Sequence, residues 1–169
     1  YTNANHGAGG STVAHTSGVA SVAPTPGTPR AFSKTIYDAA VQATYISAGK
    51  VPKAVYMSPA HKALASTFTG IASNRYEVKG TNQGAIIGGA DVYVSDFGAM
   101  THVPHYMMAG STLVYGLDLS EIKMAYLRPF FSQKLGASGD SVKEQVIVDV
   151  TLRVEAEKAC FKIADLSGG

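Results

Sequence analysis

The spacing of apolar residues predicts an amphipathic helix over residues 34–48. In this segment apolar and small side chains recur every three or four positions, so they gather on one side of a helix. Ser33 precedes the segment and is a favourable N-cap, while Gly49 follows it and suits the left-handed conformation that often ends a helix. Both ends of the helix are therefore marked in the sequence.

A short strand and a second helix are predicted next. Residues 53–57 (KAVYM) form a short β-type run. Ser58-Pro59 has the order of an N-cap and a first helical residue, and the helix that it opens is expected to extend through about Phe68. The pattern therefore predicts a helix–strand–helix passage.

From Arg75 the apolar pattern changes to alternation, which is typical of β-strands. Asp96–Gly98 is an expected turn, and Pro104 is an expected stop because proline cannot donate a backbone hydrogen bond. A short helical turn is expected over residues 117–122. The strand runs are residues 76–79, 85–87, 90–95, 101–103 and 112–115.

The C-terminal third predicts a long antiparallel hairpin. Residues 125–135 are extended, residues 136–140 (GASGD) have the composition of a loop, and residues 146–154 alternate with five apolar side chains on one face. Two glutamates break this alternation, so Glu155–Lys158 is expected to distort the second strand before residues 159–166 resume it.

Residues 1–31 have the composition of a linker or an extended arm. They are rich in Gly, Ser, Thr, Ala and Pro, and their apolar side chains are small. The GAGG run at residues 7–10 lacks the spacing of a phosphate-binding loop and predicts tight turns. Two interpretations remain open, a flexible terminus and an arm that lies along a neighbouring subunit.

The composition indicates an ordered chain that is long enough for one domain with a sizeable core. Of its 169 residues 46% are hydrophobic and 15% are charged, against about 25% charged in an average soluble protein. This excludes a disordered chain, and the net charge of +2 excludes a strongly basic nucleic-acid binder. No apolar run approaches the roughly 20 residues that span a bilayer. The low charge predicts that much of the surface faces other subunits.

No set of residues has the pattern of a catalytic, cofactor or metal site. His102 and His105 have the spacing of two metal ligands on one helical face, but Pro104 lies between them. Cys160, the single cysteine, excludes a disulfide framework and a multi-cysteine zinc site, and its alternating surroundings predict a small core side chain. We therefore assign no catalytic residue, cofactor or metal.

The hairpin supplies the candidate contact residues instead. Proline in a strand favours an edge or a bend, which Pro129 predicts for the first strand. Arg128 beside it is either solvated or paired with an acidic group across a subunit boundary. In a large assembly the tip of the hairpin is a plausible contact point. The candidate interface residues are Arg128, Lys134, Gly136, Ser138, Gly139, Asp140 and Lys143.

Three long stretches of the chain resemble one family. KAVYMSPAHKALASTFTG (residues 53–70), ADVYVSDFGAMTHVPHYMM (residues 90–108) and the ending from MAYLRPFFSQKL to KIADL (residues 124–166) are similar to segments of tailed-bacteriophage major capsid proteins, in the same order. The predicted helix at residues 34–48 lies where those proteins place one. DVYVSDFG followed by YLRPF is the most specific part of the resemblance.

The resemblance implies an α+β chain with the Hong Kong 97-type capsid fold, and it covers the C-terminal half of such a protein. Residues 1–31 would be a linker or extended arm that connects to an earlier spine helix. Residues 32–122 would be mostly the axial domain, residues 123–158 the long β-hairpin of the peripheral domain, and residues 159–169 a return strand to the axial domain. Ala156-Glu157 stands where the family has Asn-Glu, which leaves the fold unchanged. No crosslink is carried over.

The function that the resemblance implies is structural. A major capsid protein assembles with copies of itself into pentamers and hexamers of an icosahedral head that encloses double-stranded DNA. The expected partners are other capsid subunits, minor or decoration proteins, and packaged DNA held without sequence specificity. The expected location is the virion, and the host cytoplasm during assembly, with no membrane. The chain is not expected to be an enzyme.

Three alternatives stay open at this stage. The first is an encapsulin-like cellular shell protein, which shares the fold. The second is a hydrolase domain with an unrecognised site, in which Ser58, His61 and Asp96 are the first residues to test. The third is a binding module or adhesin with a β-rich face.

Overall fold

The chain folds into two compact units. The computed structural model describes residues 3–12, 14–16, 19–68, 92–136 and 139–169. One unit, called the sheet unit below, comprises Tyr1–Leu119 and Ala156–Gly169. The other, called the hairpin unit, comprises Ser120–Glu155. The hairpin unit is therefore an insertion in the sequence of the sheet unit.

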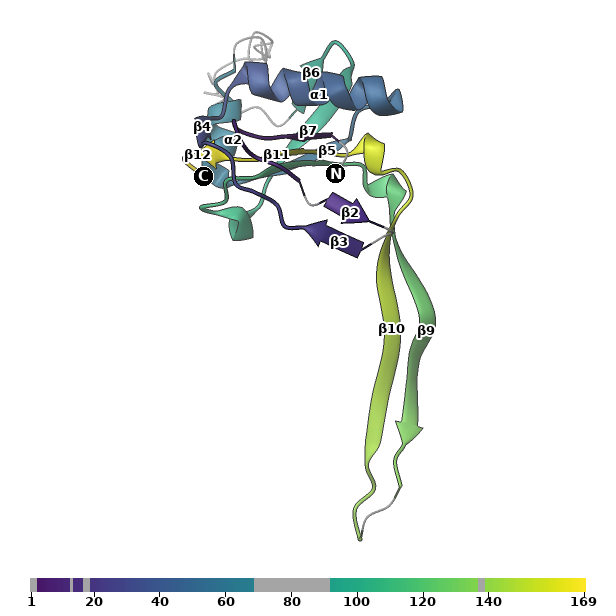
Figure 1. The fold of residues 1–169 in the computed structure, drawn as a ribbon. Coiled ribbons are helices and arrows are strands. Elements are labelled where there is room, and N and C mark those ends of the chain that lie inside the picture. The colour runs from purple at the N-terminus through teal and green to yellow at the C-terminus, as the bar shows by residue number, and fades with distance from the viewer. Residues whose placement is uncertain (1–2, 13, 17–18, 69–91, 137–138) are drawn as a thin grey trace, which may run out of the picture. The chain divides into compact units, whose positions relative to one another are not determined.

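A mixed sheet is the framework of the sheet unit (Figure 1). Among the residues described, six strands run in the order β1-β11-β8-β5-β7-β6. The pairs β1–β11 and β5–β7 are parallel, and the other neighbours are antiparallel. The strands are β1 (Asn3–Asn5), β5 (Ala54–Met57), β6 (Val92–Ser95), β7 (Gly98–Pro104), β8 (Val114–Leu117) and β11 (Phe161–Ile163).

Besides the two helices and the hairpin described below, the described residues form two small sheets and three single helical turns. β4 (Arg30–Ala31) pairs in parallel with β12 (Leu166–Ser167), and β2 (Ala14–Thr16) pairs antiparallel with β3 (Val19–Val22). The single turns are η1 (Tyr106–Met108), η2 (Leu119–Glu121) and η3 (Glu157–Ala159). Strand runs expected at residues 76–79 and 85–87 lie outside the described residues.

The first helix has the bounds that its sequence predicts. α1 spans Lys34–Ala48. The hydroxyl of Ser33 accepts a hydrogen bond from the Ile36 N–H at 3.5 Å, which satisfies one of the unpaired donors of the first turn. Gly49 ends the helix in the left-handed region (φ 69°), and its N–H donates to the Tyr45 carbonyl at 2.7 Å.

The second helix is shorter than predicted. α2 spans Pro59–Ala65, with Ser58 as its N-cap, and does not reach Phe68. Its end is tightened by polar side chains, since the Ser66 hydroxyl donates to the Lys62 carbonyl and the Thr67 hydroxyl donates to the Leu64 carbonyl. Hydroxyl groups that bond back to helix carbonyls compete with further helical hydrogen bonds, so the last residues form tighter turns.

The hydrophobic core lies between α1 and one face of the sheet. Alternate strand positions supply buried side chains on that face: Val55, Met57, Met100, Val114, Phe161 and Ile163. Gly116 is required on β8, because a Cβ atom there would lie 2.2 Å from Cε1 of Phe161. The aromatic ring thus occupies the space of the missing side chain.

Tyr37 of α1 is the centre of this core. It is fully buried, and its ring meets those of Phe32, Phe161 and Tyr93 edge to face, with centroids 5.0–6.1 Å apart. Its hydroxyl lies 2.9 Å from Nε2 of His102. Burial raises the pKa of Tyr37, so the phenol stays neutral and its hydroxyl is satisfied inside the core.

Several parts of residues 1–31, the segment predicted to be a linker or an extended arm, form paired strands. β1 forms an edge of the six-stranded sheet and β4 pairs with β12. The Arg30 guanidinium donates to the carbonyls of Asn5 (2.9 Å) and Ala164 (3.3 Å), which ties both segments to the end of the chain. β1 has the sequence Asn-Ala-Asn, so its pairing depends on backbone hydrogen bonds and leaves no apolar alternation to detect.

The side chain of Asp165 holds this N-terminal segment in place. Its carboxylate accepts the N–H groups of Gly7 (3.0 Å) and Gly27, and His6 Nδ1 lies 3.6 Å away. A Cβ atom on Gly27 would lie 2.6 Å from the carboxylate oxygen, so glycine is needed for this approach. Asp165 itself has φ 58°, a conformation that aspartate tolerates better than most residues. Partial burial opposes ionisation, but these hydrogen bonds prevail and lower the pKa of Asp165.

The hairpin unit consists of two long strands. β9 (Ile122–Lys134) and β10 (Glu144–Val154) pair antiparallel from Ile122↔Val154 to Lys134↔Glu144. The predicted long hairpin is therefore confirmed, and both strands extend beyond their predicted starts. β10 ends at Val154, and η3 follows where a distortion was predicted.

Asp165→Asn is expected to lower the stability of the protein at neutral pH by about 1 kcal/mol, the typical net contribution of one hydrogen bond. Asparagine tolerates the same backbone conformation but carries no charge. Because the pKa of Asp165 is lowered on folding, its ionic stabilisation is present above the unfolded pKa, near 4, and is lost as the pH falls through the folded value.

Thermal unfolding at neutral pH and at about pH 3 measures this difference. Asp165→Asn should differ from the parent at neutral pH and approach it in acid. Gly27→Ala should be less stable than the parent at both pH values, because the destabilisation comes from a steric clash of the added methyl group. An equal effect of Asp165→Asn at both pH values would contradict the stabilising role of the ionised Asp165 carboxylate.

Candidate functional site

The hairpin unit has no core of its own. Across the described residues of Ser120–Glu155, no side chain is fully buried. An isolated two-stranded ribbon is marginally stable in water, and large exposed apolar patches on a folded protein mark interaction surfaces. The hairpin is therefore the strongest candidate for a surface that is covered by another protein element.

One face of the hairpin is apolar along its first half. Residues that lie directly opposite in an antiparallel pair share a face. The pairs Ile122↔Val154, Met124↔Leu152 and Tyr126↔Val150 alternate with the pairs between them, so these six side chains lie on one side, called the apolar face below. Met124 is 61% exposed and Leu152 is 65% exposed, whereas the apolar side chains of a core strand are buried.

The other side of the same half carries polar and charged residues, and is called the charged face below. Lys123 lies opposite Arg153, and both pair with Glu155, at 2.5 Å and 3.1 Å. Arg128 pairs with Asp149, which lies opposite it. The hydrogen bond from Lys123 lowers the pKa of Glu155, and the hydrogen bond to Asp149 raises the pKa of Arg128. The hairpin thus presents two chemically different surfaces.

The ladder is irregular around Pro129, as its sequence predicts. Between the pairs Tyr126↔Val150 and Phe131↔Ile147, β9 advances five positions while β10 advances three. The two extra residues of β9 are accommodated where proline has no N–H to donate. Irregularities of this kind bend a ribbon. Further apolar side chains of β9, such as Phe130, are exposed in this region.

The predicted interface residues gather toward the far end of the hairpin. Lys134 lies opposite Glu144, and the Lys143 carbonyl accepts the N–H of Leu135 at 2.9 Å. Exposed residues near the tip are Gly136, Gly139 and Asp140, while Ser138 lies outside the described residues. Arg128 lies further back, and its acidic partner, Asp149, belongs to the same chain. The participation of these residues in subunit contacts stays a prediction.

The residues of the hydrolase alternative do not form a triad. The Ser58 hydroxyl accepts the N–H of His61 at 3.1 Å, as an N-cap does. The imidazole of His61 is buried, and its Nε2 lies 3.3 Å from the Ser167 carbonyl. Asp96 is exposed in the turn between β6 and β7, and in the described parts of the chain no hydrogen bond or ion pair joins it to Ser58 or His61.

The remaining candidate ligands have different surroundings. His102 is buried against Tyr37, whereas the ring of His105 stacks on Tyr106 at 5.5 Å. No group of three or more metal-ligating side chains occurs among the described residues. Cys160 is buried, as predicted for a small core residue, although it lies between η3 and β11 rather than within a strand.

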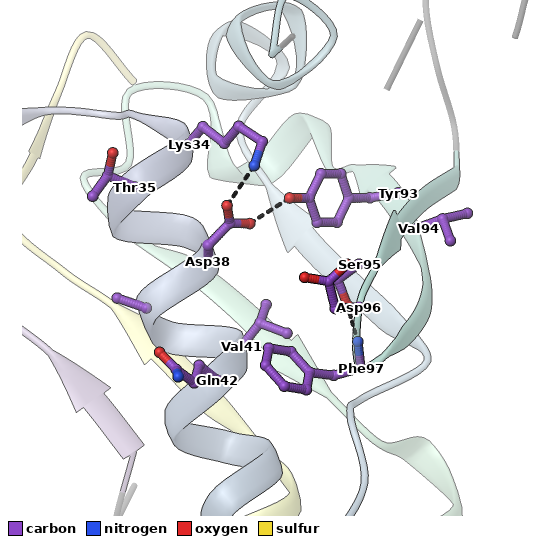
Figure 2. A pocket seen from close by; sticks show the side chains of 11 residues that line it. Lys34, Thr35, Asp38, Val41, Gln42, Tyr93, Val94, Ser95, Asp96 and Phe97 are labelled. Atoms are coloured by element: carbon purple, nitrogen blue, oxygen red, sulfur yellow. Dashed lines mark hydrogen bonds and ion pairs between the residues drawn. The ribbon is translucent and has the colours of Figure 1, made fainter. Parts of the chain in front are cut away.

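A hollow of the sheet unit lies between α1 and the β6–β7 hairpin and has a volume of about 590 Å³ (Figure 2). Lys34 Nζ lies 2.6 Å from the Asp38 carboxylate, which also accepts the hydroxyl hydrogen of Tyr93. Burial and this hydrogen bond raise the pKa of Tyr93 to about 12. The Lys34–Asp38 spacing is visible in the sequence, but no sequence signal links Asp38 to Tyr93. The wall of the hollow thus carries a proton donor, Tyr93, and an ion pair, Lys34–Asp38. These residues do not form a nucleophile–base pair.

Comparison with known proteins identifies the chain's family. The sequence model of the SU10 major capsid protein family matches residues 1–167. The chain belongs to this family. Its role is therefore that of a structural phage major capsid protein, which confirms the resemblance seen in the sequence. A search of curated proteins found no match.

Membership of this family agrees with the site geometry. A capsid protein is a virion component that assembles with other capsid subunits, and this accounts for an uncovered apolar hairpin better than a catalytic role does. The mixed α/β architecture of the capsid chain is compatible with the family. Among its described helices, none is long and apolar enough to cross a bilayer.

The assignment of Ser58 as a cap can be tested by substitution. Ser58→Ala is expected to lower stability by about 1 kcal/mol, because the first turn of α2 loses its acceptor. Ser58→Thr should retain most of that stability, since its hydroxyl can occupy the same place. Thermal unfolding of both variants measures the effect. Equal melting temperatures for Ser58→Ala and the parent would contradict the capping role.

Proposed function

We propose that this capsid chain builds an icosahedral phage head around double-stranded DNA, as part of a Hong Kong 97-type subunit arranged in pentamers and hexamers. In this proposal the sheet unit is the axial domain, and the hairpin unit is the long hairpin of the peripheral domain. Residues 1–31 contribute edge strands to the axial domain as well as a connection to earlier parts of the subunit. The resemblance of residues 53–70, 90–108 and 124–166 to tailed-bacteriophage capsid proteins supports this arrangement.

The observation that carries the proposal is the uncovered apolar face of the hairpin. Three consecutive cross-strand pairs of apolar side chains lie on one face, and five of these six side chains are exposed. The two faces of the ribbon have different chemistry. Burial of apolar area is the dominant favourable term in protein association. Assembly of the shell would cover this face, and the same contact repeated in many subunits lets each contact be modest.

The near-neutral charge of the chain indicates that its contact with packaged DNA is weak. The net charge is +2, with 14 basic and 12 acidic residues. Affinity for nucleic acid grows with the number of phosphates that basic residues neutralise, so a nearly neutral chain binds DNA weakly. Confinement of DNA in the head then depends on the closed shell.

Mass measurement of the full-length gene product tests the proposal most directly. Light scattering followed by negative-stain imaging should show particles of megadalton mass with icosahedral outlines. A monomer or dimer at all concentrations, for the full-length product under assembly conditions, would overturn the proposal.

Leu152→Asp is expected to reduce the yield of particles about tenfold or more, because a buried unpaired carboxylate costs more than 1.4 kcal/mol, the equivalent of a factor of ten. Thr151→Asp is the matched control, since Thr151 lies opposite Ala125 on the charged face. Sedimentation of assembled particles gives the yield, and circular dichroism checks that both variants fold. Equal loss of particles in both variants would contradict the role of the apolar face.

Asp140→Lys tests the tip of the hairpin. Asp140 is exposed, so its replacement should leave the melting temperature of the isolated chain nearly unchanged. If the tip contacts a neighbour, the added positive charge beside Lys134 and Lys143 should weaken assembly. Equal particle yields from the variant and the parent would remove the tip from the set of subunit contacts.

A further inference from the structure

The loop between β7 and β8 is held by backbone hydrogen bonds within itself and to β5. The His105 N–H donates to the Met57 carbonyl at 3.0 Å, and the Met108 N–H donates to the His105 carbonyl at 3.0 Å. The next two bonds, from Ala109 to Tyr106 and from Ser111 to Met108, close the turn of η1. Side chains on this loop are therefore presented in a fixed geometry, which lowers the entropy cost of binding.

The loop presents two large apolar side chains to solvent. Tyr106 is 80% exposed and Met107 is 75% exposed. The ring of His105 stacks on that of Tyr106, with an interplanar angle of 10°, which limits the motion of the phenol. Tyrosine and methionine are enriched in protein interfaces, and tyrosine is frequent among the residues that dominate binding energy. These two residues are called the knob below.

The exposed residues of α1 differ from the knob, because they are uncharged and most of them have small or medium side chains. A surface helix usually carries charged residues on its outer side. On α1 the two charged residues, Lys34 and Asp38, pair with each other at the edge of the hollow. The exposed residues of α1 are Thr35, Ala39, Gln42, Ala43, Tyr45, Ile46 and Ser47.

The hollow lies beside this surface and has both apolar and charged side chains in its lining, the charged ones being Lys34, Asp38 and Asp96. Thr35, Ala39 and Gln42 line it as well, and its apolar lining includes Val41 and Phe97. Figure 2 shows Val41 and Phe97 approaching each other from the helix and the β6–β7 hairpin, with the Lys34–Asp38–Tyr93 group further along the same hollow. A tyrosine side chain combines an apolar ring with a polar tip, so it matches an apolar lining beside a carboxylate and a phenol.

We propose that the Tyr106–Met107 knob of one capsid chain docks into the hollow along α1 of a second copy. Figure 1 shows α1 on one side of the sheet and the teal turn of η1 on the other. The two surfaces therefore differ and lie on opposite sides of one unit, which is the requirement for a head-to-tail contact that repeats around a ring. The partner is a second copy because assembly with other capsid subunits is the role of the family. The inference rests on the proposed assembly into pentamers and hexamers.

Disulfide trapping in assembled particles of the full-length capsid protein tests this contact. The double variant Met107→Cys with Ala39→Cys should give a ladder of covalent oligomers on a non-reducing gel, up to the size of a ring. The native Cys160 is buried and is retained. Particles assembled from a mixture of the two single variants should stop at covalent dimers, because each chain then carries one half of the contact.

Several outcomes would overturn the inference. Particles of the double variant that give no covalent oligomers under oxidation would show that the two surfaces do not meet. Covalent dimers from Met107→Cys alone would show a symmetric contact between knobs, and those from Ala39→Cys alone a contact between helices. Failure of the unsubstituted protein to form particles would instead count against the proposed function, so the two failures are distinguishable.

A charge substitution gives a second measurement. Ala39→Arg should reduce particle yield about tenfold, by filling the mouth of the hollow with a long charged side chain. Ala60→Arg is the control, since Ala60 is an exposed alanine of α2 outside both surfaces. Equal yields from the two variants would contradict the docking site.

Discussion

The sheet unit depends on the burial of one side chain, the phenol of Tyr37. Its ring contacts aromatic residues from three different parts of the sequence, and its hydroxyl reaches His102 on the sheet. Because these contacts fix α1 against the strands, they also fix Asp38 one residue later, beside Tyr93. The wall of the hollow and the outer side of α1 are thus set by the same core packing.

The two units solve the problem of apolar surface in different ways. The sheet unit buries its apolar residues between α1 and the strands, whereas the hairpin unit exposes nearly all of its own. A ribbon with one apolar face becomes stable when a further layer covers that face. The low fraction of charged residues in the whole chain follows from the same requirement, since surfaces that are covered in a shell carry few charges.

Elements with regular periodicity were predictable, and elements held by isolated polar contacts were not. The helix at 34–48 and the long hairpin follow from apolar spacing and end signals that are local in the sequence. β1 has no apolar alternation, and the Asp165 carboxylate reaches Gly7 from 158 positions away, so neither leaves a local signal. For the candidate site, the tip loop was predictable from its composition. The two different faces of the ribbon could be assigned only once the strand register was known. The hollow could not be predicted, because it depends on a contact between Tyr93 and Asp38, which lie far apart in the sequence.

The parallel pairing of Asn3 with Phe161 has a consequence for the timing of folding during synthesis. β11 lies between β1 and β8, so β1 has no neighbour in the sheet until the ribosome has made residues 161–163. The hairpin unit is made earlier, with its apolar face already exposed. A nascent chain therefore cannot close its sheet before residues 161–163 emerge, and contacts of high sequence separation form late. Chaperones that shield the hairpin during this interval would prevent premature association of incomplete subunits.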